Sequence, residues 1–386
     1  MKFPVGASAT IEELDADPHP LLARLRVAEP VSWIPVLGGW LVTRHDLALR
    51  VLRDTRFTVD DPRFSTAQVV GTSMLSLDGA AHTRHRDAFA RRFRPAETRA
   101  RFTAFVHDEV DRLVGAVAPR GHAEVRDDLA GPLAVAVVTE ALGLRDVTPA
   151  TIRSWYDAFV EAVSAITAGR PANATDAYDR LRAKVEAALD EHAAEDTLLT
   201  AAARHLDTDE VVANAAVLMF GGIDTTEGMI TNAVLHLLER PARLALVRDE
   251  PGLLPAAVEE SVRLEPAASV VDRYATEDVP LGTARIAKGD LVRVSITAAN
   301  RDPAVFAEPD RYDPRRANVD RHLAFAHGPH FCFGAHLARL ETMTMLRALI
   351  RLPDLRLAGT VGPRGLVFRK PLTLEVAWEP VIEEDA

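Results

Sequence analysis

Cysteine is almost absent from this chain, because Cys332 is the only one in 386 residues. A disulfide needs a second thiol and a structural zinc site needs several ligands, so a single cysteine supports neither. If Cys332 takes part in chemistry, it acts alone, either as a nucleophile or as the single thiolate ligand of a metal. The alternative is a small packed hydrophobe, which is what most lone cysteines are.

Long hydrophobic runs are absent as well. The most apolar stretch, residues 211–223, contains Asn214 and ends at Asp224, so it falls short of the roughly 18 apolar residues that cross a membrane. Residues 1–20 carry acids and prolines where a signal peptide has a basic start and an apolar core. We therefore expect a cytoplasmic protein without a membrane segment.

An excess of positive charge is also lacking. The net charge of −11 argues against nucleic acid as the main partner, since a phosphate backbone needs a basic face. With 48% apolar and 26% charged residues, the composition is that of a globular protein able to bury a sizeable core.

Prolines and polar breaks divide the chain into many helical segments and a few strand-like ones, which predicts a mainly α fold with small β-sheets. Residues 31–42 and 281–296 have the pattern of hairpins. The longest helix is predicted for residues 208–240, where Asp207 and Glu210 form a variant of the capping box. At about 1.5 Å per residue it would be roughly 45 Å long, and it is apolar nearly all round, so we expect it to be buried.

The residues around Cys332 give it a functional context. They read Phe325-Ala-His-Gly328-Pro-His330-Phe-Cys332-Phe-Gly334, and an apolar helical pattern begins directly afterwards. The glycines permit tight turns and the close approach of a bulky ring, and the start of a helix stabilises a thiolate. A merely packed cysteine does not explain two glycines, an aromatic residue and a histidine at these offsets.

This window resembles the haem-ligand signature of the cytochrome P450 family. In that signature a phenylalanine lies seven residues before the cysteine, a glycine four before it and another glycine two after it. Phe325, Gly328, Cys332 and Gly334 match these positions, while Ala326 stands where the family usually has glycine. The resemblance implies that Cys332 is the axial ligand of the haem iron. A thiolate in this position pushes electron density onto iron and favours O–O cleavage.

The resemblance also implies a fold and a cofactor. We expect the cytochrome P450 fold, with haem b (iron protoporphyrin IX) between the long central helix and the cysteine-ligand loop. Family motifs near residues 82, 225, 262 and 332 follow in the right order and serve one cofactor, so we predict a single domain over residues 1–386.

The middle of the predicted central helix contains residues that are unfavourable inside a buried helix: Gly221-Gly222-Ile223-Asp224-Thr225. Each glycine costs about 1 kcal/mol relative to alanine inside a helix, and a buried carboxylate costs more unless it is paired. A kink or a close helix crossing would explain the glycines without any chemistry. The string resembles the oxygen-activation motif of the family, which implies that Thr225 steadies the oxygen being activated and that Asp224 relays protons from solvent.

Three charged residues are expected to have a structural role. Glu260 and Arg263 are at i and i+3 on a short helix predicted for residues 254–264, so their side chains meet. Alone, such a pair is usually a solvated surface pair. With Arg311 it resembles the family's glutamate-arginine pair and third arginine, which would hold the ligand loop.

Four basic residues are candidates for holding the haem propionates. His82 and Arg86 are at i and i+4 on a helix that begins after residue 79, although an arginine-rich helix that simply faces water has the same pattern. Arg273 and His330 resemble further positions at which the family grips the propionates. The predicted cofactor-binding residues are therefore His82, Arg86, Arg273, Phe325, His330, Cys332 and Gly334.

The substrate cavity is expected from the resemblance alone, because each residue is individually more often plain core. Together they suggest an apolar cavity with few polar anchors. The predicted lining residues are Met74, Leu75, Leu218, Met219, Gly222, Ile223, Ala268, Ser269, Val270, Val271, Val367 and Phe368.

The resemblance implies a soluble bacterial-type monooxygenase that inserts one oxygen atom from O2 into a largely apolar small molecule, such as a secondary metabolite. Electrons would come from a ferredoxin or flavodoxin and its reductase, with Arg84, Arg91, Arg92 and Arg339 as a candidate docking patch. A peroxide-driven peroxygenase and a haem-thiolate sensor remain as alternatives. Peroxygenases tend to lack the acid-threonine pair, and a sensor has no reason to retain it.

Overall fold

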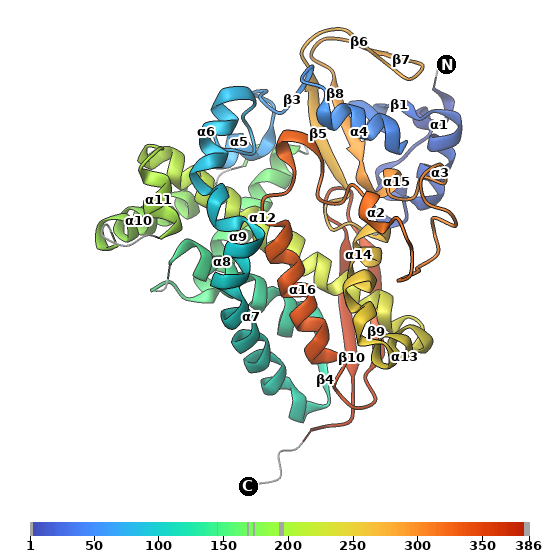
Figure 1. Cartoon of the computed structure of the whole chain (residues 1–386). Helices are drawn as coiled ribbons and strands as arrows, with labels where there is room; N and C mark the ends of the chain where they lie inside the picture. Colours follow the sequence, from blue (N-terminus) through green and yellow to red (C-terminus); the bar gives the residue numbers. More distant parts are fainter. Residues whose placement is uncertain (1–2, 145, 168–169, 173, 193–196, 382–386) are drawn as a thin grey trace.

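The computed structural model describes residues 3–144, 146–167, 170–172, 174–192 and 197–381 and is mainly helical (Figure 1). Small sheets accompany the helices, so the predicted fold class is confirmed. The α-helices are α1 Pro4–Ala7, α2 Ile11–Ala16, α3 His19–Ala28, α4 His45–Arg53, α5 Ser65–Val70, α6 Gly79–Ala90, α7 Pro95–Val117, α8 Gly131–Leu142, α9 Pro149–Thr167, α10 Thr175–Glu191, α11 Leu198–Ala203, α12 Thr208–Leu238, α13 Pro241–Asp249, α14 Leu254–Leu264, α15 Ile296–Ala299 and α16 Ala335–Leu349.

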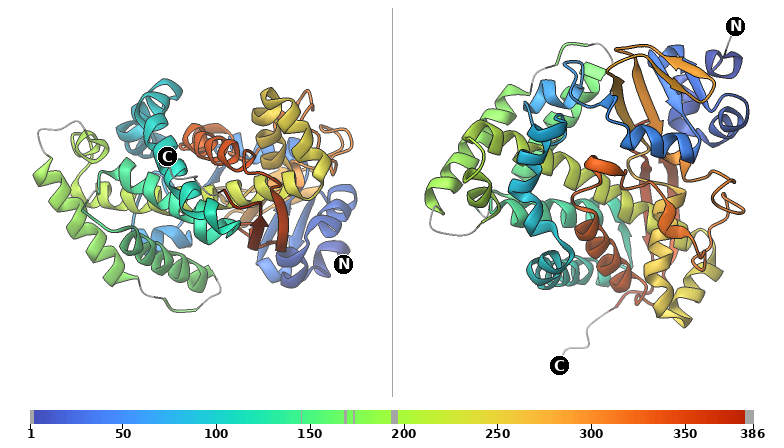
Figure 2. Two further views of the ribbon diagram at one scale, coloured as in Figure 1. Left: turned by 90° about the horizontal axis from the view of Figure 1, so that it is seen from below. Right: turned by 45° about the horizontal axis from the view of Figure 1, so that its top comes forward.

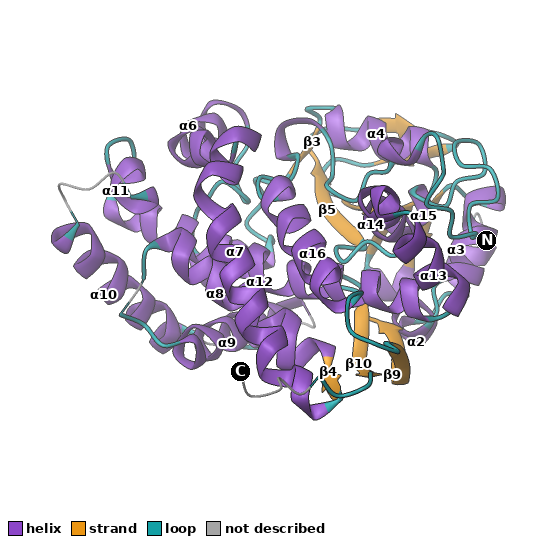
Figure 3. Ribbon diagram, turned by 60° about the horizontal axis from the view of Figure 1, so that its bottom comes forward, coloured by secondary structure: helices purple, strands orange, loops and turns teal. Residues whose placement is uncertain are grey.

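The strands form sheets that lie on one side of the molecule, whereas α6 to α11 form the other side (Figure 3). The largest sheet has the order β1-β2-β8-β5-β3, the second β4-β10-β9 and the third β6-β7. The strands are β1 Val31–Ile34, β2 Gly39–Val42, β3 Phe57–Thr58, β4 His122–Glu124, β5 Val270–Ala275, β6 Val279–Leu281, β7 Ala284–Ile286, β8 Leu291–Ser295, β9 Arg356–Arg364 and β10 Lys370–Ala377.

The long helix α12 runs across the middle of the molecule (Figure 2). The side chain of Asp207 accepts a hydrogen bond from the backbone N–H of Glu210, and the Glu210 side chain accepts from the N–H of Asp207, so the predicted capping box is present. Most of its residues are buried in the main hydrophobic core. The helix ends at Leu238, two residues earlier than predicted, because Arg240 takes an extended conformation before Pro241 begins α13.

One of the two predicted hairpins is confirmed and the other is wrong. β1 and β2 pair antiparallel from Val31↔Val42 to Ile34↔Gly39. Residues 281–296 do not form one hairpin, because the tight turn lies at Gly282, whose φ of 56° closes β6 onto β7. The strand that follows, β8, pairs with β2 and β5 in the large sheet instead.

Membrane-spanning helices are not found in the part of the chain that the structure describes, since none of its helices is both long and apolar enough.

Candidate active site

An apolar cavity of about 310 Å³ lies between α12 and the segment that carries Cys332. Its wall contains side chains from α8, α12, α14, α16, β5 and the cysteine segment, so elements far apart in sequence meet there. The predicted lining residues Met74, Leu75, Leu218, Gly222, Ala268 and Val271 all contribute to this wall. Sequence reasoning missed the contribution of α8, which supplies Val137, Val138, Ala141 and Leu142.

Other predicted lining residues do not reach the cavity. Successive side chains of a strand point to opposite faces, so Val271 lines the wall whereas Val270 faces a separate small pocket. Ile223 is fully buried in the core. Phe368 packs edge-on against Phe220, with ring centroids 5.6 Å apart. The same correction applies to Met219, Ser269 and Val367.

The chain before Cys332 folds back on itself, so that Phe325 and Cys332 are neighbours in the cavity wall. The backbone N–H of Cys332 donates to the carbonyl of Phe325 at 2.8 Å. Gly328 has a φ of 74°, and a Cβ atom there would lie 2.6 Å from the carbonyl oxygen of Leu52. Ala326 also has a positive φ, 57°, which explains why the family usually has glycine there.

The Cys332 side chain is accessible from the cavity that it lines. Burial among protein atoms raises the pKa of its thiol, while the backbone N–H groups of Gly334 and Ala335 and the charges of Arg339 and Arg86 act in the opposite direction. The two N–H groups lie at the start of α16, and Arg86 approaches from α6, so a thiolate here has partners on the protein side.

The four predicted basic residues gather beside the cavity. Arg86 and His330 line it, and the ring of His82 lies 4.3 Å from that of His330. Nε2 of His330 lies 2.8 Å from a carboxylate oxygen of Asp78. Arg273 is on the same face of β5 as Val271.

Two of these basic residues lack the partners that buried polar groups normally have. Nε2 of His82 is buried without a hydrogen-bond partner, and burial, together with the charges of His330 and Arg86, lowers the pKa of His82 to about 4. Arg273 is buried, donates to the carbonyl of Asp272 at 2.7 Å and forms no ion pair with a carboxylate among the described residues. Added acidic groups would satisfy both side chains.

The surroundings of Gly334 also suit a flat ligand. A Cβ atom added at Gly334 would meet no atom within 4 Å, although this residue lines the cavity next to Cys332. With the basic groups that lack acidic partners and the single thiol, this open space fits a planar macrocycle that bears two carboxylates and a metal.

The two glycines of the α12 string have different roles. A Cβ atom at Gly222 would lie 2.6 Å from Cγ2 of Val138, so this glycine allows α8 to cross closely. A Cβ atom at Gly221 would meet nothing within 4 Å, so this glycine leaves space in the cavity wall. The Thr225 hydroxyl, also in the wall, donates to the Gly221 carbonyl at 2.6 Å. A close helix crossing therefore explains Gly222, whereas space beside the cavity explains Gly221.

Asp224 is buried behind this wall and is paired, as a buried carboxylate must be. Nζ of Lys370 lies 2.5 Å from Asp224 and 2.6 Å from the fully buried carboxylate of Glu227. Glu227 also accepts from Arg126 at 2.6 Å and from Arg153 at 3.2 Å. Sequence reasoning missed Lys370, which is 146 residues away on β10.

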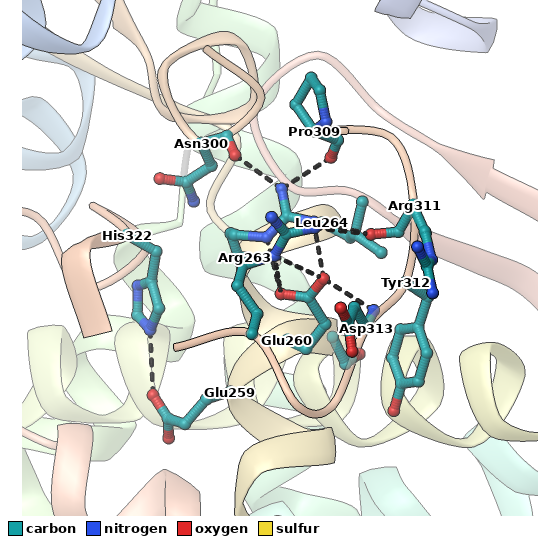
Figure 4. A network of polar contacts seen from close by, with 12 residues as sticks. Glu259, Glu260, Arg263, Leu264, Asn300, Pro309, Arg311, Tyr312, Asp313 and His322 are labelled. Carbon is teal, nitrogen blue, oxygen red and sulfur yellow. Dashed lines mark hydrogen bonds and ion pairs between the residues drawn. The ribbon is translucent and has the colours of Figure 1, made fainter. Parts of the chain in front are cut away.

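Glu260 and Arg263 form a fully buried ion pair, with bonds of 2.7 and 2.8 Å (Figure 4). Arg263 also donates to the carbonyls of Asn300, Pro309 and Arg311. The prediction that the Arg311 side chain is the third member is wrong, because it is 62% exposed and pairs with Glu308.

The third arginine is Arg316. Its Nε donates to both carboxylate oxygens of Glu260 at 3.1 Å, and its side chain is only 7% exposed. Arg311 contributes its backbone carbonyl, which accepts from Arg316 and Arg263.

Glu341 on α16 is a further acid that sequence reasoning missed. It is buried, it lines the cavity, and its Oε2 has no hydrogen-bond partner. Burial alone raises the pKa of Glu341 well above its ordinary value, which indicates a protonated carboxyl group.

Comparison with known proteins agrees with this geometry. The family model for cytochrome P450 matches residues 157–363. Cytochrome P450 monooxygenase PikC of Streptomyces venezuelae is 37% identical over 92% of this chain and 88% of its own length. Nocardicin C N-oxygenase of Nocardia uniformis subsp. tsuyamanensis is 36% identical over 94% of this chain and 96% of its own. The crystal structure of CalO2 superposes with a TM-score of 0.87 at 30% identity, covering 96% of this chain and 99% of that one. The chain therefore belongs to the cytochrome P450 family and is a bacterial-type monooxygenase.

Proposed function

We propose that this monooxygenase binds haem b with Cys332 as the axial thiolate ligand and inserts one oxygen atom from O2 into a largely apolar small organic molecule. The observation that carries the proposal is the cavity, which has the Cys332 sulfur in one wall and the Thr225 hydroxyl in another. When bound, haem supplies the iron at which dioxygen is activated. His82, Arg86, Arg273 and His330 would hold its carboxylates, and Phe325 and Gly334 would lie against the ring.

The protein's own groups provide proton delivery and the exclusion of water. The Thr225 hydroxyl faces the cavity, while Asp224, one residue earlier on α12, lies outside the wall. Asp224 would therefore pass protons from the Lys370 and Glu227 network toward the Thr225 hydroxyl. The mostly apolar wall keeps bulk water away from the reacting atoms.

The wall also favours an apolar substrate. A secondary metabolite is supported by relatives whose names include nocardicin C N-oxygenase and mycinamicin IV hydroxylase/epoxidase. The Asp224–Thr225 pair favours use of O2, because oxygen insertion from O2 consumes two electrons and two protons from solvent, whereas hydrogen peroxide brings its own protons and a sensor needs none.

A ferredoxin or flavodoxin with its reductase is the proposed electron source. Two arginines of the predicted docking patch are already paired, Arg84 with Glu210 and Arg339 with Glu259. Arg91 is exposed and has no ion-pair partner among the described residues. Phe93, two residues later, packs against Phe333 with ring centroids 4.3 Å apart, and Phe333 follows Cys332, so Arg91 is near the cysteine segment. An acidic electron carrier would be attracted there.

The test has two parts. The ferrous carbonyl complex of the purified protein should show the red-shifted Soret band of thiolate ligation, and Cys332→Ala should abolish it. Substrates are then found by the low-spin to high-spin shift of the ferric haem. A true substrate should be oxidised with NAD(P)H, ferredoxin and reductase, and not with peroxide alone. A histidine-type spectrum, or turnover by peroxide only, would overturn the proposal.

A further inference from the structure

Glu259 precedes Glu260 on α14, and its carboxylate holds side chains from both ends of the cysteine segment. It accepts from Nε of Arg339 at 2.6 Å and from Nη2 at 2.9 Å. Nε2 of His322 lies 3.0 Å from the same carboxylate (Figure 4). His322 is three residues before Phe325, and Arg339 is seven after Cys332. We call Glu259, His322 and Arg339 the clasp.

Two members of the clasp, Arg339 and His322, pack against the ring of Phe325, and the backbone of Phe325 is hydrogen-bonded to that of Cys332. The Arg339 guanidinium lies 4.2 Å above the centre of the Phe325 ring, and the His322 ring lies 5.8 Å from it. The Phe325 carbonyl accepts from the backbone N–H of Cys332. A displacement of either end of the clasp would therefore be transmitted to Cys332.

The hydrogen bonds within the clasp are charge-assisted and therefore strong. Burial raises the pKa of Glu259, but hydrogen bonds and charges from Arg339 and His322 outweigh this effect and lower the pKa to about 2. Glu259 is thus ionised at neutral pH and makes charge-assisted bonds, which are among the strong hydrogen bonds of proteins. The His322 side chain is 4% exposed, so water cannot readily replace Glu259 as its partner.

We propose that Glu259 is a positioning residue for the thiolate: through His322 and Arg339 it fixes the cysteine segment, and so sets how strongly Cys332 ligates the haem iron. This inference rests on the proposed haem-thiolate function. A thiolate stabilises ferric over ferrous iron by its charge, so a loosened ligand should raise the reduction potential.

The experiment compares haem-loaded Glu259→Gln and Arg339→Gln with the wild type. We measure the rate at which the ferrous carbonyl complex loses its red-shifted Soret band in mild denaturant, and the haem reduction potential. Because charge-assisted bonds are lost, each variant should lose the band at least about tenfold faster and have a higher potential. The double variant should be no worse than the worse single variant, since both remove one shared contact.

Glu250→Gln is the matched control, because it also removes a negative charge but breaks only the exposed pair with Arg315. It should match the wild type. Where a glutamine variant binds no haem, Arg339→Lys retains the charge and loses the paired bonds, and it should show the same two changes to a smaller extent. Clasp variants that behave like Glu250→Gln, or single effects that add fully in the double variant, would overturn the inference. Absence of the red-shifted band in the wild type would instead reject the proposed function itself.

Discussion

Replacing Arg316 tests which arginine completes the buried Glu260 network. Arg316→Ala removes both hydrogen bonds to Glu260, a fully buried carboxylate, and three more to the carbonyls of Ala307, Glu308 and Arg311. Breaking a buried pair costs about 3–5 kcal/mol. Glu260 keeps Arg263 and the backbone N–H of Asp313, so we expect the lower end, about 3 kcal/mol.

Arg311→Ala is the matched comparison, five positions earlier in the same segment. The Arg311 side chain is 62% exposed and its partner Glu308 is 72% exposed, so the loss should be about 0–1 kcal/mol. Its backbone carbonyl, which the network uses, survives the substitution. The free energy of unfolding is measured by urea titration of the haem-loaded proteins, followed by circular dichroism. If Arg311→Ala is as damaging as Arg316→Ala, the reasoning from burial is refuted.

Three further predictions follow from single positions. Ala326→Gly should stabilise the protein by about 0.5–1 kcal/mol, because relief of the positive φ outweighs the added freedom of the unfolded chain; a lower urea midpoint would contradict this. Burial raises the pKa of Glu341 in the folded protein above the ordinary value of 4.5 that it has in the unfolded chain. Its contribution to stability is therefore full below pH 4.5 and is lost as the pH rises toward the folded pKa, because only the unfolded chain then releases the proton. The stability of Glu341→Gln relative to wild type should therefore grow by up to about 1.4 kcal/mol per pH unit above pH 4.5, and parallel pH profiles would refute it. Thr225→Ala should keep the thiolate spectrum and substrate affinity but slow product formation by about 10²–10⁴ and release more peroxide per NAD(P)H; unchanged coupling would remove Thr225 from the relay.

Local signals in the sequence predicted the helices that carry the site. α14 has the predicted bounds, and α16 begins directly after the cysteine segment as predicted. Both helices have a clear apolar period, and α12 has a capping box at its start. Such signals depend on neighbouring residues, so they can be read without knowledge of the tertiary structure.

The irregular segments could not be predicted in the same way. Arg311, Arg315 and Arg316 lie close together in a stretch without helix or strand, so no period indicates which side chain points inward. Only the folded chain shows that Arg316 is buried while Arg311 and Arg315 are more than half exposed. Prediction of the cavity-lining residues was limited in the same way, because the register of β5 determines whether Val270 or Val271 faces the cavity.

The proposed role of Asp224 in proton delivery is consistent with its position, because Asp224 is buried and does not line the cavity proposed to bind substrate. An ionised carboxylate without a partner in the cavity wall would lose its water and face an apolar ligand, at a high cost in free energy. Asp224 lies instead behind the wall, where Lys370 compensates its charge and Glu227 shares that lysine with it. Glu227 has two arginines of its own, Arg126 and Arg153, so it does not depend on Lys370 alone. Among the described residues, Lys370 is the cation that bonds to both Asp224 and Glu227, so it links the two acids without itself lining the apolar cavity.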